Sequence, residues 1–194
     1  MDDLQTSAEQ PLRPGQLYRW AWIFYLVLAL AGVVWIGARE GRIPLTLFVD
    51  PGGWWIDLGL GVGAGAALLG LWELARRVLP PARALERRLG DLVAGATASE
   101  LAALALLSGF AEELFFRGAV QGQWGWLAAT LLFALLHTGP GPAFRTWTLF
   151  AALAGALFGA LMAWRGNLLA PVLAHLVVNG VNLPRLARHQ NKLK

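Results

Sequence analysis

Charged side chains that interrupt long apolar runs are the residues of this sequence best suited to chemistry. A charged group inside a membrane-spanning helix costs about 2.5 to 3.5 kcal/mol on insertion scales, so it calls for a partner or a function. One apolar run contains two adjacent carboxylates, Glu112 and Glu113, followed by Arg117. On a helix, Glu113 and Arg117 share a face, whereas Glu112 is turned away by about 100°. We therefore expect Glu113 to form a structural ion pair with Arg117, and Glu112 to have a different role.

Two later apolar runs contain further polar residues at helical spacing. Phe133 lies four residues before His137, and His175 lies four residues before Asn179. An isolated histidine or asparagine in a membrane helix more often joins helices than forms a site. A rise of ~1.5 Å per residue, however, puts Glu112 and His137 about 16 and 20 Å from the same face of the membrane. The later pair lies about 10 and 17 Å into its helix, so the matching depths predict one shared cavity.

A metal-dependent reaction is one chemistry that these side chains allow. Glu112, His137 and His175 can supply three zinc ligands and leave one coordination position open. No HExxH motif supports that interpretation, and the absence of cysteine excludes thiolate ligands and a thiol nucleophile. We expect no metal and no other cofactor, with a zinc-dependent membrane hydrolase as the alternative.

Membrane helices must position these residues. Hydrophobic residues make up 57% of the chain and charged residues only 14%, against about 25% charged residues in soluble domains. We predict an all-α fold, a polytopic integral membrane bundle of about six transmembrane helices in a single domain, residues 20–183. The expected helices are residues 20–38, 54–75, 101–121, 124–137, 146–164 and 168–183.

The segments within and between these helices differ in character. Glycine and alanine in residues 54–75 would let a neighbouring helix approach closely. Residues 76–100 mix arginines with leucines, as an amphipathic segment on the membrane surface would, although a solvated connector fits equally well. Residues 138–142 contain two glycines and two prolines, so the preceding helix must end just after His137.

The distribution of basic residues predicts the topology. The net charge of +4 and the pI of about 10.3 arise from residues spread between apolar segments, which argues against a nucleic acid partner. With six spans, the N-terminal tail (1–19), residues 76–100, residues 138–145 and the basic C-terminal tail (184–194) share the side that holds most of the Lys and Arg. The positive-inside rule then places both tails in the cytoplasm.

The three motifs EExxxR, FxxxH and HxxxN follow one another in successive apolar helices. In this order they resemble the motifs of the CPBP family of intramembrane glutamic endopeptidases, the CAAX-type prenyl proteases. The resemblance covers a motif core of residues 101–183, and all motif residues are present. It implies an endopeptidase in which Glu112 and His137 activate a water molecule, while His175 and Asn179 hold the oxyanion.

The resemblance also implies supporting roles for Glu113, Arg117 and Phe133. The expected partners are the lipid bilayer and a peptide or protein substrate that is membrane-associated or lipidated. Arginine-rich, lysine-poor usage favours the inner membrane of a prokaryotic cell, where prenylated CAAX proteins are not expected, so the substrate stays unnamed. A non-catalytic membrane scaffold of the same family is the alternative from another functional class.

Overall fold

The computed structural model describes residues 16–191, and every regular element in that range is a helix. The elements are α1 (Gln16–Glu40), the 3-10 helix η1 (Leu45–Leu47), α2 (Trp54–Val78), α3 (Pro80–Val93), α4 (Ala98–Glu113), the π-helix η2 (Leu114–Gln121), α5 (Gly122–Leu136), α6 (Pro142–Arg165) and α7 (Leu169–Asn191). Of the two predicted tails, residues 1–15 and 192–194 lie outside the described residues. The last helix extends to Asn191 instead of ending at the predicted Leu183.

Apolar side chains cover much of the outside of the bundle. α1 alone leaves Trp20, Phe24 and Leu26 more than half exposed, a surface suited to lipid. Four stretches of the described chain are long and apolar enough to cross a membrane, namely Tyr18–Glu40, Trp54–Val78, Ala98–Leu136 and Pro142–Arg165. The predicted helical membrane bundle is therefore confirmed. The predicted number of spans is not, because residues 98–136 form one continuous stretch and α7 is not among the four.

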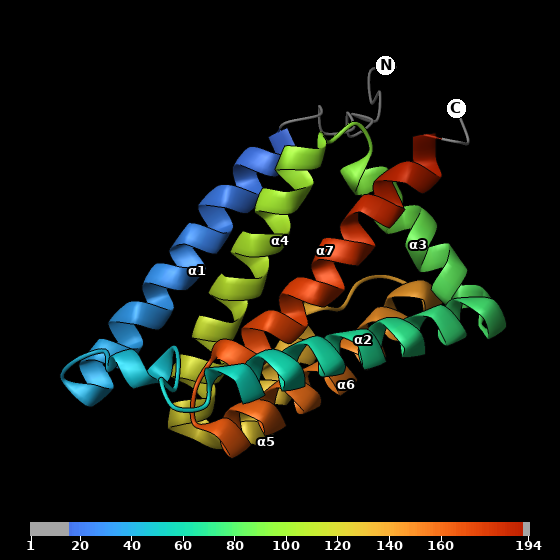
Figure 1. The fold of residues 1–194 in the computed structure, drawn as a ribbon. Coiled ribbons are helices and arrows are strands. Elements are labelled where there is room, and N and C mark those ends of the chain that lie inside the picture. Colours follow the sequence, from blue (N-terminus) through green and yellow to red (C-terminus); the bar gives the residue numbers. More distant parts are fainter. Residues whose placement is uncertain (1–15, 192–194) are drawn as a thin grey trace.

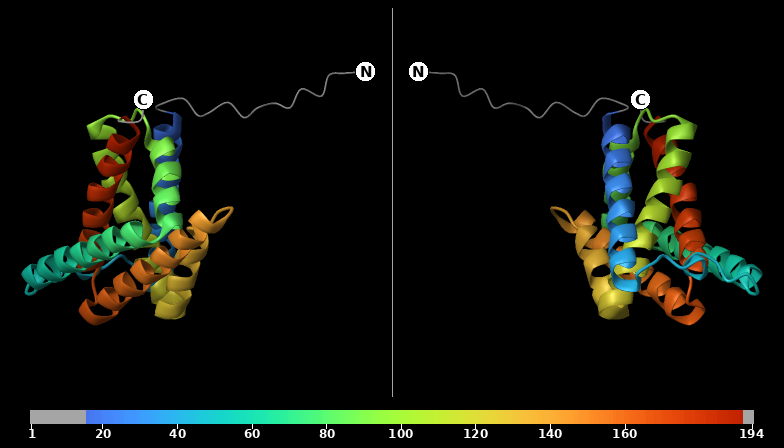
Figure 2. Two further views of the ribbon diagram at one scale, coloured as in Figure 1. Left: turned by 90° about the vertical axis from the view of Figure 1, so that its right-hand side faces the viewer. Right: turned by 90° about the vertical axis from the view of Figure 1, so that its left-hand side faces the viewer.

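The helices that hold the polar residues lie side by side. α1 packs along α4, and α4 packs along α7 (Figure 1). The beginnings of α1 and α4 and the end of α7 lie at the same end of the bundle, as the side views also show (Figure 2). Toward the other end, α5 packs against α6, and α2 crosses α7.

α3 accounts for most of the arginine-rich segment 76–100. It is amphipathic, as predicted, but its apolar face contacts protein instead of lipid: Ala82 and Leu85 are fully buried against α6 and α2. Val93, at its end, packs with residues of α4 and α7. The indole N–H of Trp72 donates a hydrogen bond to Glu86 at 3.0 Å, which fastens α3 to α2.

Two glycines allow α2 to approach α7 closely. A Cβ on Gly61 would lie 2.6 Å from Cβ of Leu173, and one on Gly65 would lie 2.6 Å from Cβ of Val177 and 2.9 Å from the carbonyl oxygen of Ala174. The two glycines are four residues apart and therefore lie on one face of α2. The expectation that small residues in this segment permit close packing is thus confirmed.

The start of α7 is fixed by the buried carboxylate of Asp57, near the start of α2. Arg165 donates a hydrogen bond to one carboxylate oxygen, and the Asn167 amide donates to the other at 3.0 Å. The side-chain oxygen of Asn167 in turn accepts from the backbone N–H of Leu169 at 2.9 Å, at the first residue of α7. This contact satisfies a donor that the helix itself leaves unpaired.

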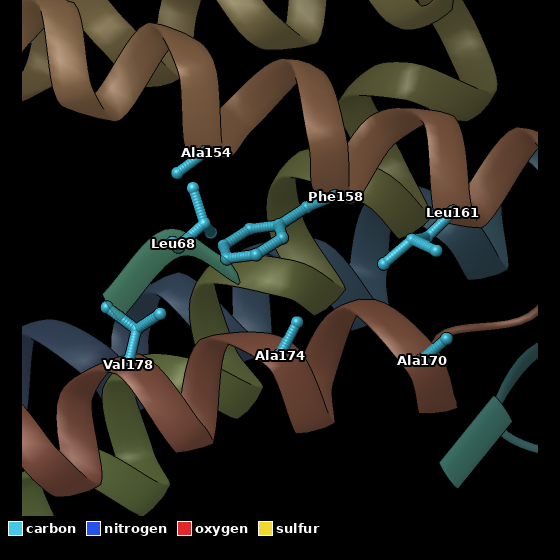
Figure 3. Close-up of a cluster of buried hydrophobic side chains, with 7 residues drawn as sticks. All are labelled: Leu68, Ala154, Phe158, Leu161, Ala170, Ala174 and Val178. Atoms are coloured by element: carbon cyan, nitrogen blue, oxygen red, sulfur yellow. The ribbon is translucent and has the colours of Figure 1, made fainter. Parts of the chain in front are cut away.

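Farther along α7, an apolar cluster sets its distance from α6. The Phe158 ring, 1% exposed, lies between the two helices with Leu68, Ala154, Leu161, Ala170, Ala174 and Val178 around it (Figure 3). Alanines on both helices leave room for the ring. α7 is thereby held by polar contacts at its start and by apolar packing along its length.

The helix that carries both carboxylates changes to π geometry directly after Glu113. The predicted third and fourth helices thus form one helical stretch to Leu136, with a kink at Gly125, where φ is 84°. The guanidinium of Arg39, from α1, donates to the carbonyl oxygens of Gly118 and Ala119 at 3.1 and 2.8 Å. The sequence did not predict the π-helix. It did predict that the helix ends at His137, and the structure confirms this.

We predict opposite effects for two neighbouring glycine substitutions in α2. Gly65→Ala should lower the melting temperature in detergent, since overpacking against Val177 costs about 1 to 3 kcal/mol. Gly63→Ala, where nothing lies within 4 Å, should leave it unchanged or raise it, because alanine favours a helix by about 1 kcal/mol over glycine. Thermal unfolding of the purified variants measures both. Equal melting temperatures would contradict the close contact of α2 with α7.

Candidate active site

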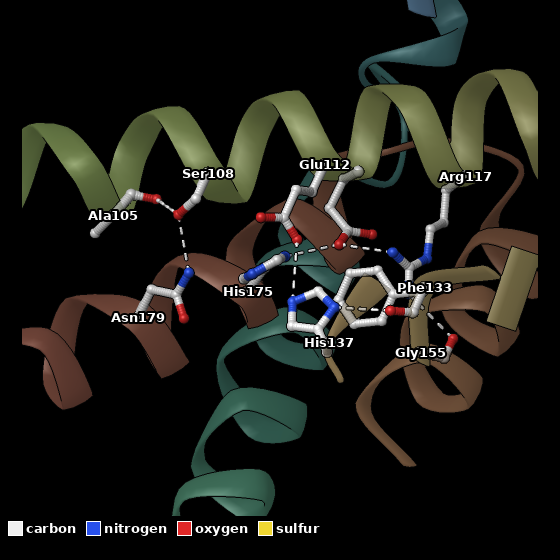
Figure 4. Close-up of polar contacts among 10 residues, drawn as sticks. Ala105, Ser108, Glu112, Arg117, Phe133, His137, Gly155, His175 and Asn179 are labelled. Atoms are coloured by element: carbon white, nitrogen blue, oxygen red, sulfur yellow. Dashed lines mark hydrogen bonds and ion pairs between the residues drawn. The ribbon is translucent and has the colours of Figure 1, made fainter. Parts of the chain in front are cut away.

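Glu113 and Arg117 form a fully buried ion pair, as predicted from their spacing. Nη1 of Arg117 lies 3.0 Å from Oε1 of Glu113, and both side chains are 0% exposed. Nη2 of Arg117 donates to the carbonyl oxygen of Gly155 at 3.2 Å, and the guanidinium carbon lies 4.5 Å from the centre of the Phe133 ring. The ring and the carbonyl thus hold the cation against the carboxylate. Phe133 supports this pair from α5 (Figure 4).

The same oxygen of Glu113 also binds a histidine. Nδ1 of His175 lies 2.8 Å from Oε1, so Glu113 joins Arg117 of η2 to His175 of α7 (Figure 4). The His175 ring also stacks on Phe158, with ring centres 5.3 Å apart. The structure thus pairs His175 with Glu113, whereas His137 faces Glu112. Glu113 is consequently more than a counterion for Arg117.

Glu112 faces His137. Its Oε2 atom lies 3.7 Å from Nε2 of His137, too far for a direct hydrogen bond. Nδ1 of His137 lies 2.7 Å from the carbonyl oxygen of Phe133. Because a carbonyl oxygen only accepts, Nδ1 carries a proton, and in the corresponding neutral tautomer Nε2 is an acceptor. The two facing atoms, Oε2 and Nε2, are therefore both acceptors, and Oε2 is buried without a partner among the described residues.

Asn179 is placed by a residue that the sequence analysis did not include in the site. Its Nδ2 donates to the hydroxyl of Ser108 at 2.9 Å, and the hydroxyl in turn donates to the carbonyl oxygen of Ala105 at 3.3 Å. Ser108 lies one helical turn before Glu112, as Asn179 lies one turn after His175. One N–H of the Asn179 amide remains available to another acceptor.

A cavity of about 730 Å³ connects these groups. Glu112, His137, His175 and Asn179 all line it, so the structure brings the four predicted residues to one cavity. Glu113, Arg117 and Phe133 lie behind them and are not part of the lining. The lining also includes residues of α1 and α3 and, toward the end of α7, the exposed side chains of Arg185 and Arg188. The cavity thus extends from the polar cluster toward the end of the bundle where α7 finishes.

The two glutamates and two histidines of the cluster form separate pairs, and they do not surround a common position where a metal ion could bind. Within residues 16–191, no group of three His, Asp or Glu side chains has an arrangement that could hold a metal ion. His137 faces Glu112, and His175 binds Glu113. The geometry is that of two adjoining acid–histidine pairs in one cavity.

Comparisons with known proteins extend these observations. Residues 94–181 match the family model described as type II CAAX prenyl endopeptidase Rce1-like. A segment of 83 residues, 40% of the chain, is 40% identical to the uncharacterized protein YpbD of Bacillus subtilis (strain 168), of which it covers 41%. The chain thus spans about two fifths of the length of this curated relative. No solved structure matches the chain significantly.

The matched segment includes every motif residue that suggested the resemblance, from Glu112 to Asn179. It begins in the turn before α4 and ends within α7. α1 and α2 lie outside it, although both pack against it. Residues 94–181 of this chain are therefore similar to the Rce1-like family of type II CAAX prenyl endopeptidases, in agreement with the resemblance predicted from the motifs.

Proposed function

We propose that this protein is an intramembrane endopeptidase that uses Glu112 as its general base. The family match supports a membrane protease-type function. The observation that carries the glutamate mechanism is the pair of acceptors, Oε2 of Glu112 and Nε2 of His137, 3.7 Å apart and facing one cavity. Two acceptors at this separation can share the two protons of one water molecule, each at ordinary hydrogen-bond distance.

In the first step, that water attacks the carbonyl carbon of the scissile peptide bond. The C–O bond forms as one water proton passes to Glu112, and His137 holds the water through its other proton. Glu112 is 6% exposed and nothing among the described residues donates to its Oε2 atom, so the carboxylate is available to take the proton. Glu112 then passes the proton to the leaving nitrogen as the C–N bond breaks.

The negative charge that develops on the carbonyl oxygen needs donors. The free N–H of Asn179 is one, and the imidazole of His175, which lines the same cavity, is proposed as the other. Glu113 supports this arrangement by accepting from Nδ1 of His175 at 2.8 Å, which fixes the ring.

The substrate we propose is a membrane-associated or lipidated peptide or protein. The volume of the cavity, about 730 Å³, suits a short peptide segment, and the mixture of leucines and arginines in its lining suits a chain with both apolar and charged groups. We further propose an inner-membrane location with both termini in the cytoplasm. The common end of α1 and α7 supports an even number of crossings. The cavity would then open toward the cytoplasm.

Substitution of the two adjacent glutamates should separate catalysis from stability. Glu112→Gln keeps the shape of the side chain but removes the proton acceptor, so cleavage should fall by about 10² to 10⁴-fold while the melting temperature stays unchanged. Glu113→Gln leaves Arg117 buried without its anion and should cost about 3 to 5 kcal/mol of stability. Its activity should also fall, because His175 loses its anchor.

The measurement compares peptide fragments by mass spectrometry between membranes that contain equal amounts of folded wild-type protein or of one variant. A stable, inactive Glu113→Gln protein together with an active Glu112→Gln protein would reverse the assignment. Normal cleavage by both variants would remove the peptidase proposal.

Chelation distinguishes the glutamate mechanism from a zinc hydrolase. Water activation by Glu112 needs no metal, so fragment production in detergent should persist after dialysis against a strong chelator. Loss of activity that added zinc restores would favour coordination by Glu112, His137 and His175.

The proposed topology can be tested by cysteine labelling, since the chain has no native cysteine. Ser99→Cys, at the beginning of α4, should react with an impermeant maleimide only from the cytoplasmic side. Thr46→Cys, in the exposed turn after α1, should react only from the opposite side. Both changes are small, so folding should be preserved. The reverse pattern would invert the topology, and labelling of both from one side would contradict a crossing by α1.

A further inference from the structure

α1 contributes a tyrosine to the cavity that no motif of the sequence indicated. Tyr25 lines the cavity together with Ser108 and Glu112 of α4, and it is partly buried. It lies outside residues 94–181, the segment that matches the family model. Nothing in the motif pattern therefore assigns it a role.

The register of α1 against α4 places Tyr25 beside the proposed base. The two helices run in the same direction (Figure 1), and a Cβ on Gly32 would lie 3.2 Å from Cα of Phe115. Tyr25 and Ser108 are each seven residues before these contacting positions, about 10 Å back along their helices at ~1.5 Å per residue. Tyr25 therefore lies level with Ser108, one turn from Glu112. The phenol therefore lies close to both the Glu112 carboxylate and the Ser108 hydroxyl, which line the same cavity.

Tyr25 thereby lies next to two polar pairs of the site, Glu112 with His137 and Ser108 with Asn179. Glu112 faces His137 on one side, and Ser108 accepts the hydrogen bond of Asn179 on the other. A neutral phenol has a single O–H donor, and a carboxylate is its strongest acceptor in this neighbourhood. Such a bond to one carboxylate oxygen would leave Oε2 without a donor, as observed.

We propose that Tyr25 is a positioning residue of the active site, whose phenol O–H donates to Glu112 and holds its Oε2 atom toward His137. The effect of Tyr25 on catalysis rests on the proposed function. The contact between Tyr25 and Glu112 does not, and it can be tested without cleavage of a substrate. Tyr25 acts through Glu112 and need not touch the substrate. α1 thus adds a residue to a cavity whose proposed catalytic residues come from α4, from the end of α5 and from α7.

The contact can be tested without an activity assay, because the chain has only two tyrosines. Incorporation of 3-fluorotyrosine gives two fluorine resonances, which Tyr25→Phe and Tyr18→Phe assign by removing one each. Glu112→Gln should shift the Tyr25 resonance and leave that of Tyr18 in place, since Tyr18 lies two turns away and contacts Trp22. An unchanged Tyr25 resonance in the folded Glu112→Gln protein would overturn the proposal.

The catalytic consequence is tested by Tyr25→Phe, which removes only the hydroxyl. Without this contact Glu112 is less well oriented toward His137, so kcat should fall roughly tenfold to a hundredfold. KM and the melting temperature should stay at their wild-type values. If the hydroxyl had a purely structural role, its removal would instead lower the melting temperature. Tyr18→Phe, the same change on the same helix, should match the wild type in all three quantities.

Two outcomes separate the failure of this inference from that of the proposed function. Wild-type kcat in the Tyr25→Phe protein, or a fall in kcat accompanied by a matching loss of stability, would reject the positioning role. Absence of cleavage by the wild-type protein would reject the peptidase proposal instead. In that event the fluorine shift alone decides whether Tyr25 binds Glu112.

Discussion

The site depends on one buried carboxylate that binds two partners at once. Oε1 of Glu113 contacts the guanidinium of Arg117 at 3.0 Å and Nδ1 of His175 at 2.8 Å. A buried carboxylate without such partners would be unfavourable, so both contacts stabilise it in the bundle. Because Arg117 follows on the same helical stretch and His175 lies on α7, the charge requirement of one residue fixes the position of one helix against another. The cavity between them is a consequence.

The sequence was sufficient to predict the helical membrane fold and the residues that meet in the cavity. Ionisable groups are costly in lipid, so their few positions in apolar runs were informative. Residue spacing also predicted the pairing of Glu113 with Arg117, a local contact within one helical stretch. It did not predict the contact of Glu113 with His175. That contact depends on the rotation of α7 about its axis, which packing around Phe158 and the glycines of α2 determines.

Ser108 and Tyr25 escaped the sequence analysis for a related reason. Each is a common residue in an otherwise apolar helix. The four-residue spacing of Ser108 from Glu112 was the one signal for Ser108, and no spacing within α1 connects Tyr25 to the polar motifs. Their proximity to Asn179 and Glu112 follows from the register between helices, which a periodic pattern in one segment does not specify. The π-helix after Glu113 was equally invisible, because its stabilising donor, Arg39, lies far away in the chain. Contacts between distant segments thus account for the features that were missed.

The π-helix also determines which way Glu112 faces. Within η2 the backbone makes wider turns than an α-helix, so each residue adds less rotation about the helix axis. If these residues adopted α geometry at the same length, everything before them would turn relative to α5. Glu112 would then turn away from His137, and Gly118 and Ala119 would no longer meet Arg39. Substitutions that favour regular α-helical turns should therefore be tolerated elsewhere in this fold, and selected against in the eight residues after Glu113.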